Sequence, residues 1–178
     1  MKHLVMLLAF STIMLSACKK DKDNAIPSNL PRTDVPTQLQ GSWMYGYFSM
    51  TEYWAQNPAT YLGNGFEVAI AFKFFPNGTF EQYFTSSTVT AGVKTYHQSF
   101  SKGTVEVNVA ASTFTTHCAS SHYKRTQNGI TVEDRDLAGS ELNGATKYQF
   151  ANTTDNGTKA VLLTLEGTSN PLKFLQKF

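Results

Sequence analysis

The chain has 178 residues, of which 15 are lysine or arginine and 13 are aspartate or glutamate, so its formal net charge is +2. This length suits one domain with a single hydrophobic core. The near balance of charge provides no strong positive field, which argues against nucleic acid as a partner.

The first seventeen residues have the layout of a signal peptide. Lys2 and His3 form a short basic start, an apolar stretch runs from Leu4 to Leu15, and the small residues Ser16 and Ala17 follow. The apolar stretch would reach ~18 Å as a helix, which is well short of the ~30 Å hydrocarbon core of a bilayer. We therefore predict a signal peptide over residues 1–17 rather than a membrane-spanning helix.

Residues 15–18, Leu-Ser-Ala-Cys, resemble the lipobox of bacterial lipoproteins. The resemblance implies that Cys18 receives a diacylglycerol and becomes the acylated N-terminus, so outer-membrane lipid would be a partner. Lys19 stands where an aspartate would imply inner-membrane retention, so we expect outer-membrane anchoring, facing either the periplasm or the cell surface. An ordinary signal peptide with an incidental cysteine is the alternative.

The segment that follows is typical of a flexible tether. Residues 18–36 are charged at first and then rich in Pro, Asn and Ser, with prolines at 27, 31 and 36 and few apolar side chains. We predict a lipidated tether over residues 18–36 and one folded domain over residues 37–178.

Asn-Gly pairs punctuate this domain. They occur at residues 64–65, 77–78, 128–129, 143–144 and 156–157. Asn and Gly both tolerate the positive φ angles that tight hairpins require, so the pairs predict a meander of antiparallel strands.

Between the pairs, apolar and polar residues alternate with the period of a strand. Phe66, Val68, Ile70, Phe72 and Phe74 share one face, and Val105 and Val107 repeat the pattern later in the chain. We predict an all-β fold, an antiparallel up-and-down barrel of about eight to ten strands. Ser49 to Glu52 has the form of a capping box, so a short helix or an aromatic-rich loop is expected after the first strand.

Gly41-Ser42-Trp43 resembles the start of the first strand in lipocalins and related calycin barrels, and residues 37–178 are similar to bacterial lipocalin-like lipoproteins. The resemblance implies a central cavity for an apolar small molecule and a tryptophan at the closed end beneath a basic residue of the last strand. No arginine occupies that strand, so Lys173 or Lys177 would substitute, and a two-sheet sandwich is the alternative fold.

The inward aromatic face supplies the candidate ligand-binding residues. If Trp43 points inward, strand alternation also turns Tyr45 and Tyr47 inward. The predicted ligand-binding set is Trp43, Tyr45, Tyr47, Phe66, Val68, Ile70, Phe72 and Phe74. These rings either line a pocket or fill a solid core.

Residues with metal-ligating side chains gather at His117, Cys118 and His122. A hairpin through Ala119 and Ser120 would place the two histidines opposite one another, but two ligands fall short of the three or four that zinc needs. We therefore predict no metal and no cofactor, and expect Cys118 to be a small buried residue. Because no catalytic motif is present, a non-enzyme is predicted, with an enzyme built around the two histidines as a weaker alternative.

Two functions follow from these patterns. The first is a membrane-anchored, lipocalin-like lipoprotein that binds a small apolar or amphipathic molecule without catalysis. The alternative is an envelope interaction module, a filled barrel that docks a protein or a glycan through exposed Tyr53, Trp54 and Tyr61.

Overall fold

A computed structural model describes residues 26–48, 53–55, 66–142 and 144–177. Within these residues the chain forms nine antiparallel strands and two single-turn 3-10 helices. The strands are β1 (Gly41–Tyr45), β2 (Phe66–Phe74), β3 (Thr79–Thr90), β4 (Val93–Asn108), β5 (Thr113–Gln127), β6 (Ile130–Leu137), β7 (Ala145–Asp155), β8 (Thr158–Leu165) and β9 (Leu172–Gln176). The predicted all-β antiparallel architecture is confirmed, and the strand number lies within the predicted range.

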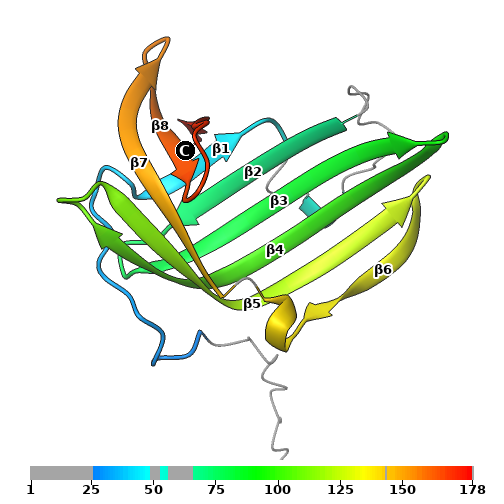
Figure 1. Cartoon of the computed structure of the whole chain (residues 1–178), viewed down its shortest axis with the longest axis horizontal. Coiled ribbons are helices and arrows are strands. Elements are labelled where there is room, and N and C mark those ends of the chain that lie inside the picture. Colours follow the sequence, from blue (N-terminus) through cyan, green and yellow to red (C-terminus); the bar gives the residue numbers. More distant parts are fainter. Residues whose placement is uncertain (1–25, 49–52, 56–65, 143, 178) are drawn as a thin grey trace, which may run out of the picture.

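The strands form one ring-like sheet. The order around the ring is β1, β2, β3, β4, β5, β7, β8 and β9, and pairing of β9 with β1 completes it. In the described part of the chain β6 pairs with β5 alone and extends the sheet sideways. In Figure 1 the ends of β3, β4 and β6 project to one side, away from β7 and β8.

Strand β5 changes its partner halfway along. Its first part, Thr113–His117, pairs with β7, whereas its second part, Ser121–Gln127, pairs with β6. The pairing of β4 with β5 shifts between Lys102 and Gly103, so that Ala119 is an extra residue in β5. A β-bulge of this kind bends a strand, and here it separates the closed part of the ring from the part that β6 extends.

Tight turns form where Asn-Gly pairs predicted them. Asn128-Gly129 and Asn156-Gly157 adopt φ angles of 48° and 84°, and of 48° and 80°, at the β5–β6 and β7–β8 hairpins. Asn77-Gly78 connects β2 to β3, and Gly78 has a φ of 76°. Asn64-Gly65 lies outside the described residues, as does Asn143. The β3–β4 hairpin turns instead at Ala91-Gly92, a pair that the Asn-Gly pattern did not include.

The main core lies inside the ring. It contains rings and aliphatic side chains from most strands together with two residues that precede β1: Val35, Leu39, Trp43, Phe72, Phe74, Phe80, Val105, Phe114, Phe150, Val161, Leu163 and Phe174. Phe72 and Phe74 stack with centroids 5.5 Å apart, and Phe114 meets Phe74 edge-on at 5.2 Å. Burial of this much apolar surface is the dominant stabilising contribution to the fold.

Part of the segment predicted as a tether packs against the sheet. The backbone N–H of Thr33 donates to Val105 and that of Val35 donates to Pro76, at 3.0 and 3.1 Å. The Thr104 hydroxyl donates to the carbonyl of Pro31 at 2.6 Å, and Val35 is only 3% exposed. The packed structure therefore starts at about Pro31, before the predicted domain boundary at Thr37.

A second, smaller core covers the outer face of β2 and β3. It consists of Met44, Phe48, Tyr53, Ala69 and Ala71, with Tyr83 and Phe100 packed against it. Tyr53 belongs to the 3-10 helix η1 (Tyr53–Ala55), which lies where a short helix or a loop was expected. Residues 49–52, which carry the predicted capping box, lie outside the described residues.

No helix in the described ranges is long and apolar enough to span a membrane.

Candidate functional site

A cavity of about 370 Å³ lies inside the ring, next to the main core. It lies where the pairing partner of β5 changes from β7 to β6. Strands β4 and β5 form its floor, and β3, β6, β7 and β8 contribute to its sides. Its lining residues are Phe80, Gln82, Phe84, Ser99, Ser101, Thr116, Cys118, Ser121, Leu137, Glu141, Thr146, Tyr148 and Leu165. The volume lies at the lower end of the range of small-molecule pockets, roughly 300–1,000 Å³.

Hydroxyl side chains form a stripe along the floor of this cavity. Ser101 on β4 donates to the Ser121 hydroxyl on β5 at 2.9 Å. Thr116 donates to the carbonyl of Thr146 at 3.3 Å. Since each hydroxyl has one donor and two acceptor positions, this stripe keeps hydrogen-bonding capacity directed into the cavity.

Apolar surface flanks the stripe on both sides. Phe80 and Phe84 come from β3, Leu137 ends β6, and Leu165 ends β8. The Tyr148 ring stacks on Phe114 with centroids 5.0 Å apart, which fixes it between the cavity and the core. The lining therefore combines a polar floor with apolar sides, a combination that suits an amphipathic ligand.

Cys118 lines the cavity as a half-buried free thiol. Burial raises the pKa of this thiol, although hydrogen bonds with Ser101 and the Ser120 carbonyl act in the opposite direction. A thiol with a raised pKa is a poor nucleophile, because the thiolate is the reactive form.

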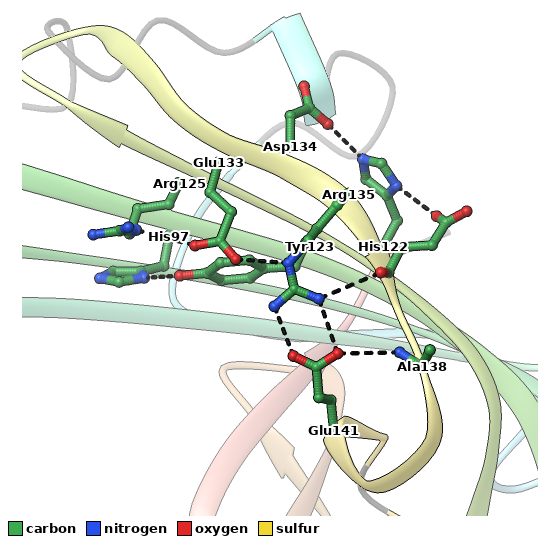
Figure 2. A network of polar contacts seen from close by, with 10 residues as sticks. His97, His122, Tyr123, Arg125, Glu133, Asp134, Arg135, Ala138 and Glu141 are labelled. Carbon is green, nitrogen blue, oxygen red and sulfur yellow. Dashed lines mark hydrogen bonds and ion pairs between the residues drawn. The ribbon is translucent and has the colours of Figure 1, made fainter.

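A network of ion pairs lies at the rim, where β6 meets the 3-10 helix η2 (Gly139–Glu141) (Figure 2). Arg135 donates to both carboxylate oxygens of Glu141, at 2.6 and 2.9 Å, and to Glu133 at 2.8 Å. Glu133 also lies 3.4 Å from Arg125. The hydrogen bonds from Arg135, followed by the one from the Ala138 N–H, lower the pKa of the Glu141 carboxyl. The Glu141 carboxylate at the cavity is thus ionised and already paired.

His97 and Tyr123 extend the same inner surface beyond the cavity. Nδ1 of His97 lies 2.6 Å from the Tyr123 hydroxyl, as Figure 2 shows. Burial, followed by the nearby Arg125, lowers the pKa of His97. The imidazole is therefore neutral at pH 7, which leaves this surface without an added positive charge.

Comparison with known proteins finds no relative of this chain. No protein-family model, curated protein or solved structure matches the chain. The site must therefore be interpreted from its own residues.

The predicted ligand-binding residues lie mostly in the core rather than around this cavity. Trp43 is 2% exposed, and its indole N–H donates to the Leu39 carbonyl at 2.8 Å. Phe72 and Phe74 are buried, whereas Tyr45, Val68 and Ile70 are half-buried. Phe66 begins β2, and its side chain lies outside the described part of the structure. The seven predicted residues whose side chains are described do not appear in the lining of the 370 Å³ cavity.

The prediction that Tyr47 points inward is wrong. Strand β1 ends at Tyr45, Gly46 follows with a φ of 76°, and Tyr47 is 78% exposed. Strand alternation cannot be extended across a residue in the left-handed region. A Cβ on Gly46 would also lie 2.7 Å from the Cβ of Ala69, so close approach of β2 requires glycine there.

The hairpin through Ala119 and Ser120 that would have placed the two histidines opposite one another does not form, because both residues lie within β5. His117 and His122 are therefore on one strand, and each has its own acidic partner. His117 Nε2 lies 2.8 Å from a carboxylate oxygen of Glu106. In His122, Nε2 lies 2.7 Å from Asp134 and Nδ1 lies 2.7 Å from Asp136. Among the described residues no group of three or more His, Cys, Asp or Glu side chains could hold a metal ion.

A shallow depression of about 290 Å³ lies on the outer face, beside His122. It is lined by Trp54, Phe100, His122, Lys124 and Asp134. Trp54 is 37% exposed and meets the His122 ring edge-on at 5.0 Å, whereas Tyr53 is buried. Of the three residues predicted for docking, only Trp54 is exposed in the described structure, and Tyr61 lies outside it.

Lys173 does not lie over Trp43. It is exposed and pairs with Asp155 at 3.2 Å, whereas the next residue, Phe174, points into the core. Lys177 donates its backbone N–H to Ser42 at 2.8 Å.

Sequence reasoning missed the floor of the cavity because its residues are small and polar. One signal was present: Phe114, Thr116 and Cys118 alternate along β5, so Thr116 and Cys118 lie on the same face as core residue Phe114. Polar residues in register with a core residue can indicate a face that leaves the core and enters a polar cavity.

Proposed function

We propose that this protein is a non-catalytic, lipid-anchored envelope protein of the lipocalin-like type that binds one small amphipathic molecule. The observation that carries the proposal is the 370 Å³ cavity inside the ring-like sheet, with its hydroxyl floor and apolar sides. Anchoring through Cys18 to the outer membrane rests on the lipobox-like residues 15–18, which lie outside the described residues.

The proposal assigns ligand binding to the cavity residues and a supporting role to the aromatic core. Trp43, Phe72 and Phe74 hold the strands at fixed spacing through packing, so the neighbouring cavity stays open. The pKa of Cys118 is raised, and His117 and His122 pair with acidic side chains rather than with this thiol, so neither histidine activates it, which favours binding over catalysis.

The test uses the mature chain, residues 18–178, with Cys18→Ser so that detergent is not needed. Native mass spectrometry followed by denaturing extraction would identify any molecule retained in purification. Calorimetric titration with fatty acids, monoacylglycerols and sterols below their micellar concentrations would then measure affinity. We expect at least one of these amphiphiles to bind.

A pair of variants locates the site. Thr146 lines the cavity and its neighbour Ala145 is exposed on the opposite face of β7. Thr146→Phe should fill the cavity and weaken binding by roughly ten-fold or more, which corresponds to ~1.4 kcal/mol, whereas Ala145→Phe should bind like the parent chain. Absence of binding to the whole panel, or equal binding by the two variants, would overturn the proposal.

A second candidate, docking of a protein or glycan, is favoured by Trp54 alone. This exposed ring stands over the depression that Phe100 and Asp134 also line. If docking is the function, Trp54→Ala should abolish binding of envelope glycans or proteins and leave amphiphile binding unchanged. If the cavity is the site, only Thr146→Phe should matter.

A further inference from the structure

The charge balance of the cavity restricts the class of ligand that it can hold. Glu141 is the one charged side chain among the described lining residues. Both of its carboxylate oxygens accept hydrogen bonds from Arg135, and one of them also accepts from the Ala138 N–H at 3.3 Å. This carboxylate therefore has its strongest interactions with the protein, and little of its hydrogen-bond acceptor capacity remains for a ligand cation.

The positive charges beside the cavity are paired as well. Arg135 is shared between Glu141 and Glu133, and Arg125 lies against Glu133. A ligand carboxylate or phosphate that bound either arginine would compete with these glutamates. That exchange replaces one ion pair with another and adds the cost of desolvating the ligand anion.

Uncharged polar groups are, in contrast, abundant. Ser99, Ser101, Ser121 and Thr116 face the cavity from adjacent strands, and the Gln82 amide lies between Phe80 and Phe84 on β3. Hydroxyls and amides both donate and accept, so they match ligand hydroxyls without any change of charge. A purely apolar ligand would leave the remaining donor and acceptor positions of these groups without partners, which costs free energy where the ligand excludes water.

Building on the proposed function, we infer that the ligand is a neutral amphiphile that bears hydroxyl groups. Its hydroxyls contact the Ser101 and Ser121 stripe, and its apolar part lies against Phe80, Phe84 and Leu165. The Arg135–Glu141 pair discriminates against charged head groups because it leaves no free charge at the rim.

The experiment compares two probes with the same acyl chain in the Cys18→Ser mature chain at pH 7.5. Glycerol monododecanoate is neutral and has two hydroxyls, and dodecanoate carries a carboxylate. Calorimetry below the micellar concentrations should show that the glycerol ester binds at least about ten-fold more tightly. Equal or tighter binding of dodecanoate would overturn the inference and leave the proposed function standing.

If neither probe binds, the inference also fails, and the wider amphiphile panel then decides whether the proposed function fails with it. If a charged amphiphile were the sole ligand in that panel, the inference that the ligand is neutral would fail and the proposed function would stand. The two failures are thus distinguishable.

Variants test the physical reason directly. Glu141→Gln removes the carboxylate that two nitrogens of Arg135 bind, while Arg135 keeps its contact with Glu133, so it should strengthen dodecanoate binding several-fold with little effect on the ester. Glu166→Gln makes the same change at a carboxylate that pairs with Lys147, away from the rim pair, and should change neither affinity. Ser101→Ala with Ser121→Ala should weaken the ester and leave dodecanoate unchanged. An unaltered preference in both test variants would overturn the assignment.

Discussion

Gly103 on β4 lies directly against His117 on β5, so that a Cβ on Gly103 would stand 1.9 Å from the His117 carbonyl oxygen. The same Cβ would lie 2.9 Å from the Phe80 ring. This contact sits at the register shift between the two strands, next to the cavity. Glycine is thus required here by space, because its φ is not in the left-handed region.

Gly103→Ala should destabilise the protein by about 2–4 kcal/mol, because backbone on one side and a core ring on the other prevent relaxation. Gly144→Ala is the matched control, since nothing lies within 4 Å of its Cβ position, and it should change stability by less than ~0.5 kcal/mol. Urea unfolding of both variants measures the difference. If the two variants were equally stable, β4 and β5 would move apart around the new Cβ at little cost in free energy.

Removal of residues 18–36 should weaken the fold, although their composition predicts a tether. The truncation loses the buried Val35 side chain and the hydrogen bonds of Thr33 and Val35 to the sheet. Burial of a valine contributes about 1.5–3 kcal/mol and each hydrogen bond ~1 kcal/mol, so we expect a loss of at least about 3 kcal/mol.

A chain that starts at Pro27 is the control for this truncation, because it keeps every one of these contacts. It should unfold at the same urea concentration as the mature Cys18→Ser chain. If the chain that starts at Thr37 matched both, the packing of residues 31–35 would contribute nothing measurable.

His122 should stabilise the protein more at low pH than at high pH. Burial lowers its pKa, but hydrogen bonds with Asp136 and Asp134 outweigh this and raise the pKa above 6.5. A raised pKa means that the stabilisation is fully present below the unfolded pKa and is lost as pH rises through the folded value. Trp54 and Lys124 also border this ring.

His122→Gln should therefore cost more stability at pH 5.5 than at pH 8.5, by less than ~1 kcal/mol because the pair is partly exposed. His97→Gln should show the opposite pH trend, since burial lowers the pKa of His97 and its protonation opposes folding. Urea unfolding at both pH values checks this. Identical trends for the two histidines would contradict the assigned environments.

Cys18 should carry the membrane anchor. In a bacterium with lipoprotein-processing enzymes, the full chain should sediment with membranes, and mass spectrometry should find its mature N-terminus at an acylated Cys18. The Cys18→Ala chain should lack the acyl groups and either leave the membrane fraction or remain a precursor. A parent chain that is cleaved elsewhere and recovered without lipid would rule out the anchor.

Local patterns in the chain were sufficient to predict the strand class and several hairpins. The positive φ angles at Asn128-Gly129 and Asn156-Gly157 follow from side-chain chemistry within two residues. The inward face of Ile70, Phe72 and Phe74 follows from the period of two in a strand. These properties depend on neighbours along the chain, so sequence reasoning reached them.

Tertiary structure alone decided which end of the ring is filled and which is hollow. Val35 and Leu39 enter the core beside Trp43, and no periodicity relates them to the strand that they cover. The cavity appears where β5 leaves β7 for β6, and the pairing of β5 with β7 joins strands that are separated in sequence by the whole of β6. Because free volume depends on how side chains from distant strands meet, the aromatic face became a packed core, and the small polar residues beyond it form the floor of the cavity.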